Sequence, residues 1–163
     1  MTSLATLVAT AAFVGACRPP VSPPAPPSIQ LRIVGREHRW RFEHPGPDGV
    51  LDTPDDRVST GDLHLPADIP VRLELHSDDD LYFFGIPALD AKQIAMPDLT
   101  YWLSLGANPA GRFDLLGDLM CGGSYPQMRG QLVIEPWSSY TTWLERQPLL
   151  QANASRTYPE SQS

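Results

Sequence analysis

Cysteine, basic charge and long hydrophobic runs are all scarce in this chain of 163 residues. With 12 Lys and Arg against 19 Asp and Glu, the net charge of −7 argues against a nucleic-acid partner and against an anionic membrane surface. The uncharged apolar run at residues 1–16 is too short to cross a bilayer as a helix. The length suits one domain with a substantial core better than two.

Motifs of hydrolytic chemistry are also missing. The chain contains no G-x-S-x-G, no H-E-x-x-H and no glycine loop of the kind that holds phosphate. The two glycines of "CGGSYP" serve a tight loop beside the cysteine. We therefore expect a protein that is not an enzyme.

The N-terminal residues predict export. The stretch "MTSLATLVATAAFVGA", residues 1–16, is typical of the core of a signal peptide. "VGAC" resembles the bacterial lipoprotein processing box, which makes Cys17 the lipidated first residue of the mature protein. No Lys or Arg precedes the apolar run, so a plain signal peptide with an incidental cysteine is the alternative. Either way we expect a periplasmic or other extracytoplasmic protein that meets the membrane only through a lipid anchor.

Lipidation of Cys17 would leave Cys121 as the one remaining thiol. An unpaired thiol in an oxidising compartment is expected to be buried, bound to metal or paired between chains. A disulfide between the two cysteines of one chain is disfavoured, because Cys17 lies beyond a long tether.

Composition divides the rest of the chain into three parts. Residues 17–28 form a tether whose "RPPVSPPAPPS" is of the stiff, extended, proline-rich kind. Residues 148–163 are polar and predict a disordered tail. Between them, residues 29–147 predict one folded domain without internal repeats.

That domain has the pattern of an all-β protein. Short β-branched or alternating segments are separated by Pro, Gly and Asp turns, which favours a Greek-key barrel or sandwich. The predicted strands lie at residues 29–34, 38–44, 62–66, 69–77, 80–86, 100–105, 112–116 and 129–135. An acidic turn, "DGVLDTPDD", separates two of the strands. The one predicted helix spans residues 137–147, with Ser138 or Ser139 as its N-cap.

Three stretches in this region resemble the copper-binding domain of cytochrome c oxidase subunit II. They are "HRWRFEHPGPDGVLDTPDD", "DLHLPADIPVRLELHSDDDLYFFGIPAL" and "AGRFDLLGDLMCGGSYPQMRGQLVIEP", and the match runs from about residue 33 to residue 145. The resemblance implies a cupredoxin-like Greek-key β-barrel with a short C-terminal helix. In that family the domain carries a dinuclear copper centre, CuA, that accepts electrons from a cytochrome.

The resemblance also shows that the family's ligand pattern is altered here. That pattern is a histidine in a "DVLHSF"-like stretch followed by C-x-E-x-C-x-x-x-H-x-x-M. Its second cysteine and its methionine are retained as Cys121 and Met128. The other four positions have changed, and they correspond to Tyr82 and Tyr125 for the two histidines, Gly117 for the first cysteine and Leu119 for the glutamate. With one bridging thiolate gone, the dinuclear centre cannot form.

A different copper site is predicted instead. Tyrosine at both histidine positions brings phenol oxygens, and the pKa of a phenol falls beside a metal cation. We expect one copper ion, cycling between Cu(II) and Cu(I), with Cys121 as principal ligand, Tyr82 and Tyr125 as equatorial ligands and Met128 as a weak axial donor. Gly117 is expected to leave room there for water or a small ligand. The implied partner is a redox or copper-donor protein.

Two alternatives remain open. Tyr82 sits in the aromatic run "LYFF", so it can be a core residue of a metal-free scaffold that docks to a respiratory or other membrane complex. The second alternative is a homodimer joined through Cys121.

The histidines and tryptophans are weaker candidates for a metal or electron-transfer site, and His38 in place of a tyrosine ligand is the disfavoured alternative. The four histidines lack metal-type spacing, and each is expected to be solvated or hydrogen-bonded: His38, His44, His64 and His76. In the resemblance, His38 takes the place of the tryptophan at which electrons enter the family's domain. The four tryptophans are expected to be core and helix-docking residues: Trp40, Trp102, Trp137 and Trp143.

Overall fold

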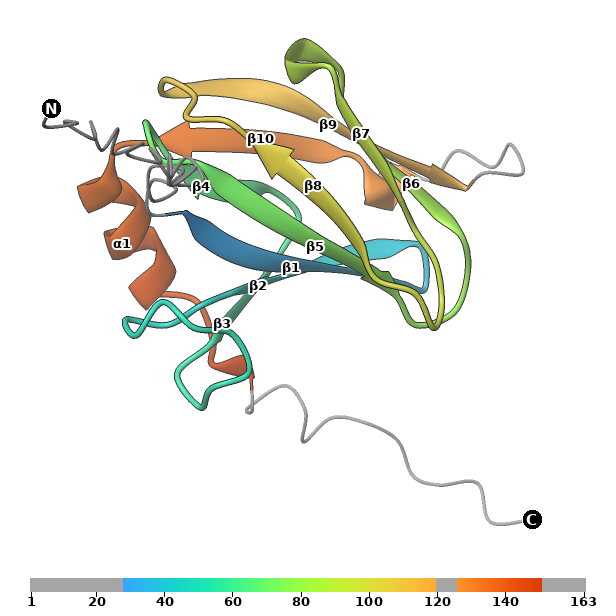
Figure 1. Ribbon diagram of the computed structural model, residues 1–163, viewed down its shortest axis with the longest axis horizontal. Coiled ribbons are helices and arrows are strands. Elements are labelled where there is room, and N and C mark those ends of the chain that lie inside the picture. Colours follow the sequence, from blue (N-terminus) through green and yellow to red (C-terminus); the bar gives the residue numbers. More distant parts are fainter. Residues whose placement is uncertain (1–27, 120–125, 151–163) are drawn as a thin grey trace, which may run out of the picture.

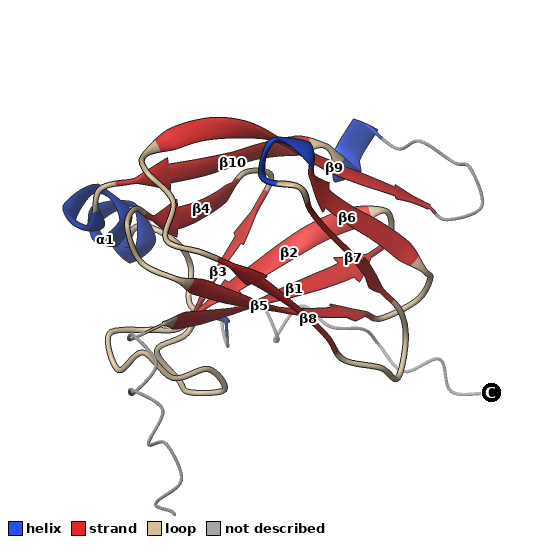
Figure 2. Cartoon of the chain, turned by 45° about the horizontal axis from the view of Figure 1, so that its top comes forward, coloured by secondary structure: helices blue, strands red, loops and turns tan. Residues whose placement is uncertain are grey.

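The computed structural model describes residues 28–119 and 126–150, and in this part the chain forms two five-stranded β-sheets (Figures 1 and 2). In spatial order, the first sheet contains β3 (Arg57–Thr60), β2 (Arg39–His44), β1 (Ile29–Arg36), β5 (Val71–Ser77) and β8 (Tyr101–Leu105). The second contains β4 (Leu63–Pro66), β10 (Gly130–Glu135), β9 (Gly111–Leu119), β6 (Tyr82–Ile86) and β7 (Ala91–Ala95). Two pairs are parallel, β1 with β5 and β4 with β10, and the other pairs are antiparallel. The prediction of an all-β domain is confirmed.

The core lies between the two sheets because each strand turns its apolar side chains inward. In β5, Val71, Leu73 and Leu75 are buried against the facing sheet, whereas Arg72 and His76 point outward. This alternation with a period of two residues made the strand predictable from its sequence. Each predicted strand segment overlaps an observed strand, but β3 and β7 were not predicted.

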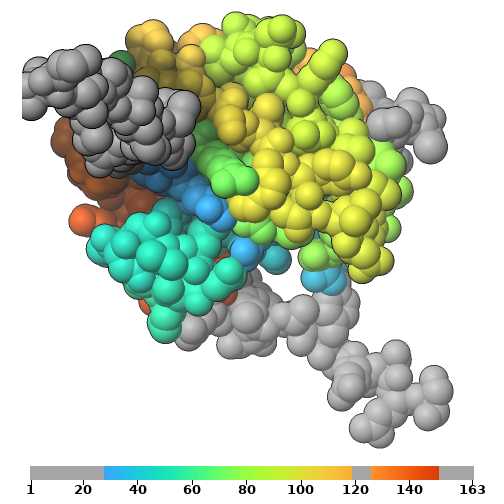
Figure 3. All heavy atoms as spheres, in the orientation of Figure 1, coloured from blue at the N-terminus to red at the C-terminus, as the bar shows by residue number. Residues whose placement is uncertain are grey.

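A charged network covers the outer face of the first sheet. Arg32 on β1 binds both carboxylate oxygens of Asp52, at 2.7 and 2.9 Å, and it also reaches Glu43 and Glu74, each at 3.3 Å. Asp52 belongs to the acidic turn, here the loop 45–56, which forms a prominent lobe (teal) in Figure 3. The loop is therefore fastened to the sheet by Arg32, and the buried carboxylates of Glu43 and Glu74 are paired.

The helix α1 (Trp137–Glu145) ends two residues earlier than predicted, and its N-cap is Pro136. Ser138 and Ser139 lie inside the helix, and no side chain caps its first turn, so the predicted cap is wrong. At the other end, Arg57 of β3 donates to the carbonyl oxygens of Glu145 and Gln147, at 3.2 and 2.7 Å. This contact satisfies carbonyls that a helix C-terminus leaves without a partner inside the helix.

Beneath α1 lies a polar cluster built around two histidines. The ring of His44 is fully buried, with its nitrogens 3.2 Å from the Tyr140 hydroxyl and 3.1 Å from the Ser59 hydroxyl. His64 stacks on Trp143 with ring centroids 4.0 Å apart and contacts Glu135 at 2.7 Å. Both histidines are hydrogen-bonded as expected, and together they dock the helix on the barrel. Within the described residues, no helix is long and apolar enough to cross a membrane.

Candidate metal centre at one end of the sandwich

Two of the four predicted ligands lie among the described residues. Tyr82 opens β6 and is fully buried, and Met128 ends the short 3-10 helix η2 (Pro126–Met128), also fully buried. Cys121 and Tyr125 fall in residues 120–125, outside the described residues, as does the predicted lipidation site Cys17.

The backbone explains why Tyr82 lies at this end of the fold. β6 pairs with β9 in a register that sets Tyr82 opposite Leu119 and Phe84 opposite Gly117. Leu119 is the last residue of β9, and Cys121 follows it by two positions in the sequence. Tyr82 therefore faces the strand end from which the chain continues to the cysteine.

The Tyr82 hydroxyl is held by two hydrogen bonds. It donates to Oδ1 of Asp79 at 2.7 Å and accepts from the backbone N–H of His38 at 3.3 Å. Glu37 and His38 both have positive φ, 50° and 58°, which makes a tight two-residue turn between β1 and β2. That turn directs the N–H of His38 at the phenol, and the N–H of Glu37 donates to Asp79 at 2.7 Å.

These contacts decide the charge of the two groups. Burial and the hydrogen bond to Asp79 raise the pKa of Tyr82 to about 12, so the phenol is neutral in the folded chain without metal. Burial alone would raise the pKa of the Asp79 carboxyl as well. The donors from Glu37, Tyr82 and Asp80 outweigh it and hold that pKa below its usual value. The pair is thus a protonated phenol donating to a carboxylate.

Trp40 is the central contact of this end, and the sequence did not identify it as part of the site. Its indole lies edge-on to Tyr82 at 5.8 Å and to Phe84 at 5.5 Å, and its Nε1 donates to the carbonyl oxygen of Met128 at 3.1 Å. Gly35 makes room for the arrangement, because a Cβ there would lie 2.5 Å from the Tyr82 ring. Gly35 comes directly after the predicted strand 29–34 and lies inside the observed β1, and a glycine in a strand often marks such a close approach.

No protein-family model matches the chain. It is 32% identical over 142 residues to the alternative cytochrome c oxidase subunit 2 of Bradyrhizobium diazoefficiens, a match that covers 74% of this chain and 51% of the relative. It is 26% identical to the cytochrome c oxidase subunit 2 of Thermostichus vulcanus, covering 83% of this chain and 40% of the relative. The chain thus spans about half or less of the length of these relatives.

Solved structures give the same answer for the fold. The periplasmic domain of subunit II of cytochrome oxidase (CoxB) of Bradyrhizobium japonicum superposes with a TM-score of 0.58 at 17% identity, covering 79% of this chain and 96% of that one. The same subunit in a mixed disulfide intermediate with thioredoxin-like TlpA gives 0.60 at 16% identity, covering 77% and 94%. The folded part of this chain is a cupredoxin domain of the oxidase subunit II type.

This subunit II-type domain does not fit the family's dinuclear centre. A Cβ added to Gly117, at the position of the family's first cysteine, would lie 2.3 Å from Nε1 of Trp40 and 2.7 Å from the carbonyl oxygen of Met128. The room expected beside Gly117 is therefore filled by the indole and by backbone, which corrects that expectation. No cysteine side chain can occupy this position unless Trp40 or the Met128 backbone moves.

The histidines and tryptophans that were not predicted as ligands lie in several different environments. Within the described residues, no group of three or more His, Cys, Asp or Glu side chains could hold a metal ion. The His38 ring lies edge-on to Tyr82 with centroids 6.2 Å apart. Trp40 is buried in the core and Trp143 stacks on His64, as expected. Trp137 is 52% exposed at the start of α1, and Trp102 is 38% exposed on β8 under Arg72, so the expectation of a core or helix-docking position is wrong for Trp102.

Proposed function

We propose that this chain is an extracytoplasmic cupredoxin domain of the subunit II type that binds one copper ion in place of the dinuclear centre. Cys121 is the principal ligand, Tyr82 and Tyr125 are the oxygen ligands, and Met128 is a weak axial donor. The observation that carries the proposal is the placement of Tyr82. Hydrogen bonds to His38 and Asp79 hold its hydroxyl oxygen. The residue itself is paired with the last residue of β9, from which the chain continues to Cys121.

The donor set suits a single copper ion in the oxidised state. Bound copper would supply one-electron chemistry between Cu(II) and Cu(I). A thiolate and phenolate oxygens add negative charge, which favours the higher oxidation state and lowers the reduction potential. The domain would therefore serve copper handling or low-potential electron transfer rather than accept electrons from a high-potential cytochrome.

The chain's own residues have distinct parts in this proposal. Asp79 holds the Tyr82 hydroxyl and can receive its proton when the phenol becomes a ligand. Trp40 fills the volume beside Gly117, which leaves no space for a second thiolate and so limits the site to one ion. Trp40 also holds the backbone of Met128 through its indole N–H.

The relatives support a location and a class of partner for this chain. The CoxB domain is periplasmic and forms a mixed disulfide with a thioredoxin-like protein. We extend the location to this chain, with Cys17 as the lipid anchor, and we infer a redox or copper-donor protein as its partner. Copper and electrons would be exchanged there, and the domain itself would catalyse no reaction on an organic substrate.

Loading the purified chain with Cu(II) tests the proposal directly. We expect one equivalent to bind and to produce a thiolate- or phenolate-to-copper charge-transfer band. The band should disappear in Cys121→Ser and shift in Tyr82→Phe and Tyr125→Phe. Tyr101→Phe is the matched control, because the Tyr101 hydroxyl contacts Met96 instead. Binding of two equivalents, or a band unchanged in Cys121→Ser, would contradict the single-ion site.

A metal-free docking domain is the second candidate, and one observation favours it. The Tyr82 phenol keeps its proton and already has a partner in Asp79, so metal binding must displace both. In this case the loaded protein stays colourless and holds no copper after dialysis. A dimer joined through Cys121 would appear on non-reducing electrophoresis and collapse with reductant.

A further inference from the structure

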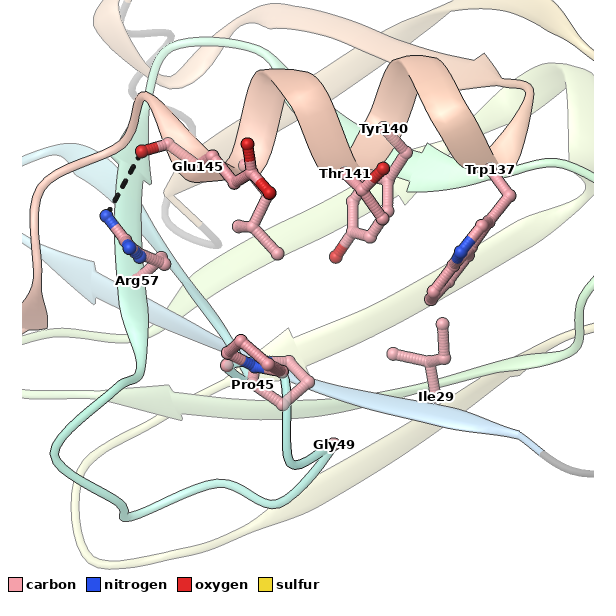
Figure 4. Close-up of a pocket in the computed structure, with 11 residues that line it drawn as sticks. Ile29, Pro45, Gly49, Arg57, Trp137, Tyr140, Thr141 and Glu145 are labelled. Atoms are coloured by element: carbon pink, nitrogen blue, oxygen red, sulfur yellow. Dashed lines mark hydrogen bonds between the residues drawn. The ribbon is translucent and has the colours of Figure 1, made fainter.

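An apolar groove with a volume of about 300 Å³ lies at the opposite end of β1 from the candidate metal centre. One wall is α1, which presents Trp137, Thr141 and Leu144 from one face of the helix, with buried Tyr140 at the base (Figure 4). The other wall is the start of the loop 45–56, from Pro45 to Gly49. The side chain of Trp137 is 52% exposed at this groove, which is unusual for so large an apolar residue.

The groove lies next to the start of β1, the first strand of the domain. Ile29, the first residue of β1, lines it beside Trp137, and Glu145 and Arg57 line its other end (Figure 4). The eleven residues before Ile29, "RPPVSPPAPPS", include six prolines and one charge, Arg18. A proline-rich segment is thus tethered directly at the mouth of an aromatic-lined groove.

Proline-rich chain is the kind of ligand that such a groove accepts. Its extended left-handed helix is preformed, so docking costs little conformational entropy, and aromatic-lined grooves are its usual receptors. A short tether also gives an effective concentration in the millimolar range, so that weak contacts suffice.

The length and the charge of the proline-rich segment also match the groove. The helix α1 from Trp137 to Glu145 has nine residues, and its rise from the first to the last is about 12 Å at 1.5 Å per residue. Residues 19–24, "PPVSPP", span about 19 Å in the polyproline conformation, enough to follow the whole face. Residues 25–28 remain to reverse the chain direction at Ile29. Arg18 then comes to the end of the groove at which exposed Glu145 lies.

The geometry points to an intramolecular docking site, in which residues 19–24 fold back into the groove between α1 and Pro45–Gly49, with Arg18 facing Glu145. The occupant is this chain's own proline-rich segment. Docking would fix the direction in which the segment leaves the barrel, and so the orientation of the domain relative to whatever lies N-terminal to it. The inference stands whether or not the barrel binds copper.

Nuclear Overhauser contacts in the purified full chain test this. We expect contacts between proline protons of residues 19–24 and the ring of Trp137. In a variant with all four prolines of residues 19–24 replaced by serine, those contacts should be lost and the Trp137 indole signal should move. Trp102, which is exposed on β8 and stacks with Arg72, is the matched control, and its signal should stay. These changes leave the barrel sequence intact.

Two results would overturn the inference. One is an indole signal of Trp137 that is the same in the wild-type chain and in the serine variant. The other is a set of contacts seen only between labelled and unlabelled copies in a mixed sample, which would make a second copy the occupant. An added peptide of residues 18–28 should bind the groove of the serine variant and return the Trp137 indole signal towards its wild-type position.

Discussion

At Gly117 the missing side chain is what lets Trp40 reach across the sandwich. Trp40 belongs to β2 in the first sheet and Gly117 to β9 in the second, so their contact joins the two layers. We expect Gly117→Cys, which restores the family's residue, to lower the free energy of unfolding by about 1–3 kcal/mol through overpacking. Denaturant unfolding measures the change.

The control is a glycine with open space around it. A Cβ at Gly106 would meet nothing within 4 Å, so Gly106→Ala should leave stability unchanged or raise it slightly. Combining Gly117→Cys with Trp40→Phe should recover part of the loss, because the two residues share one volume. Equal stability of Gly117→Cys and the wild-type chain would show that the indole moves aside freely.

The position of Tyr82 was predictable, whereas its surroundings were not. Spacing relative to neighbouring motifs located it at a ligand position of the family pattern. The partners of its hydroxyl come from a turn at residues 37–38 and a loop at residues 78–80, which only the folded chain brings together. The filling of the Gly117 site by Trp40 is likewise a contact between sheets, and no local pattern encodes it.

At the scale of single elements, the end of α1 depends on one side chain from another strand. Arg57 of β3 donates to two carbonyl oxygens, those of Glu145 and Gln147. We expect Arg57→Met to lower the free energy of unfolding by about 1.5–3 kcal/mol, the range for hydrogen bonds to a charged group. Hydrogen exchange of the α1 amides should rise with it.

A second arginine gives the comparison. Arg112 on β9 is exposed, and its side chain donates to that of Gln131 at 3.1 Å on the surface of the sheet. Arg112→Met should therefore change stability by less than about 0.5 kcal/mol. If Arg57→Met and Arg112→Met behave alike, the contact with the helix end contributes nothing to stability.

Strands with clear alternation were predictable, and the two that were missed lack it. β3 has only four residues, "RVST", directly after the acidic loop, and β7 reads "AKQIA", with a single large apolar residue. Their pairing is decided by neighbours, since β3 adds to the edge beside β2 and β7 to the edge beside β6. Edge strands of this kind depend on tertiary context more than on their own sequence.

Over the whole molecule, the two ends of the sandwich have different polar chemistry. β1 runs from the groove at Ile29 to the turn beside Tyr82, eight residues or about 25 Å. At one end the Tyr82 phenol donates to the Asp79 carboxylate, and β9 ends there two residues before Cys121 in the sequence. The other end holds neutral His44 beneath α1. A change of pH therefore acts on the docking of the helix separately from the candidate metal centre.

The buried ring of His44 predicts how the free energy of unfolding changes with pH. Burial, with a smaller effect from the charge of His64, lowers the pKa of His44 to about 3, whereas in the unfolded chain it is near 6.5. Between these values the unfolded chain binds a proton that the folded chain does not, so stability falls as the pH falls from about 6.5 towards 3. At pH 5 the loss relative to neutral pH should be about 2 kcal/mol, at 1.4 kcal/mol for each pKa unit. Urea unfolding at pH 7, 6 and 5 measures it, above the range in which the carboxylates titrate.

His44→Gln should remove this dependence between pH 7 and pH 5, whereas His64→Gln should keep most of it. Because a buried substitution can also weaken the fold at every pH, the slope with pH is the quantity to compare, and an NMR titration of the His44 ring checks the wild-type chain directly. A ring that titrates near 6.5, or a wild-type slope that persists in His44→Gln, would mean that the histidine is not buried in its neutral form. The acid sensitivity of the domain between pH 7 and pH 5 would then have to come from a group other than His44, and the stacking of Trp143 on His64 would remain as a contact that docks the helix.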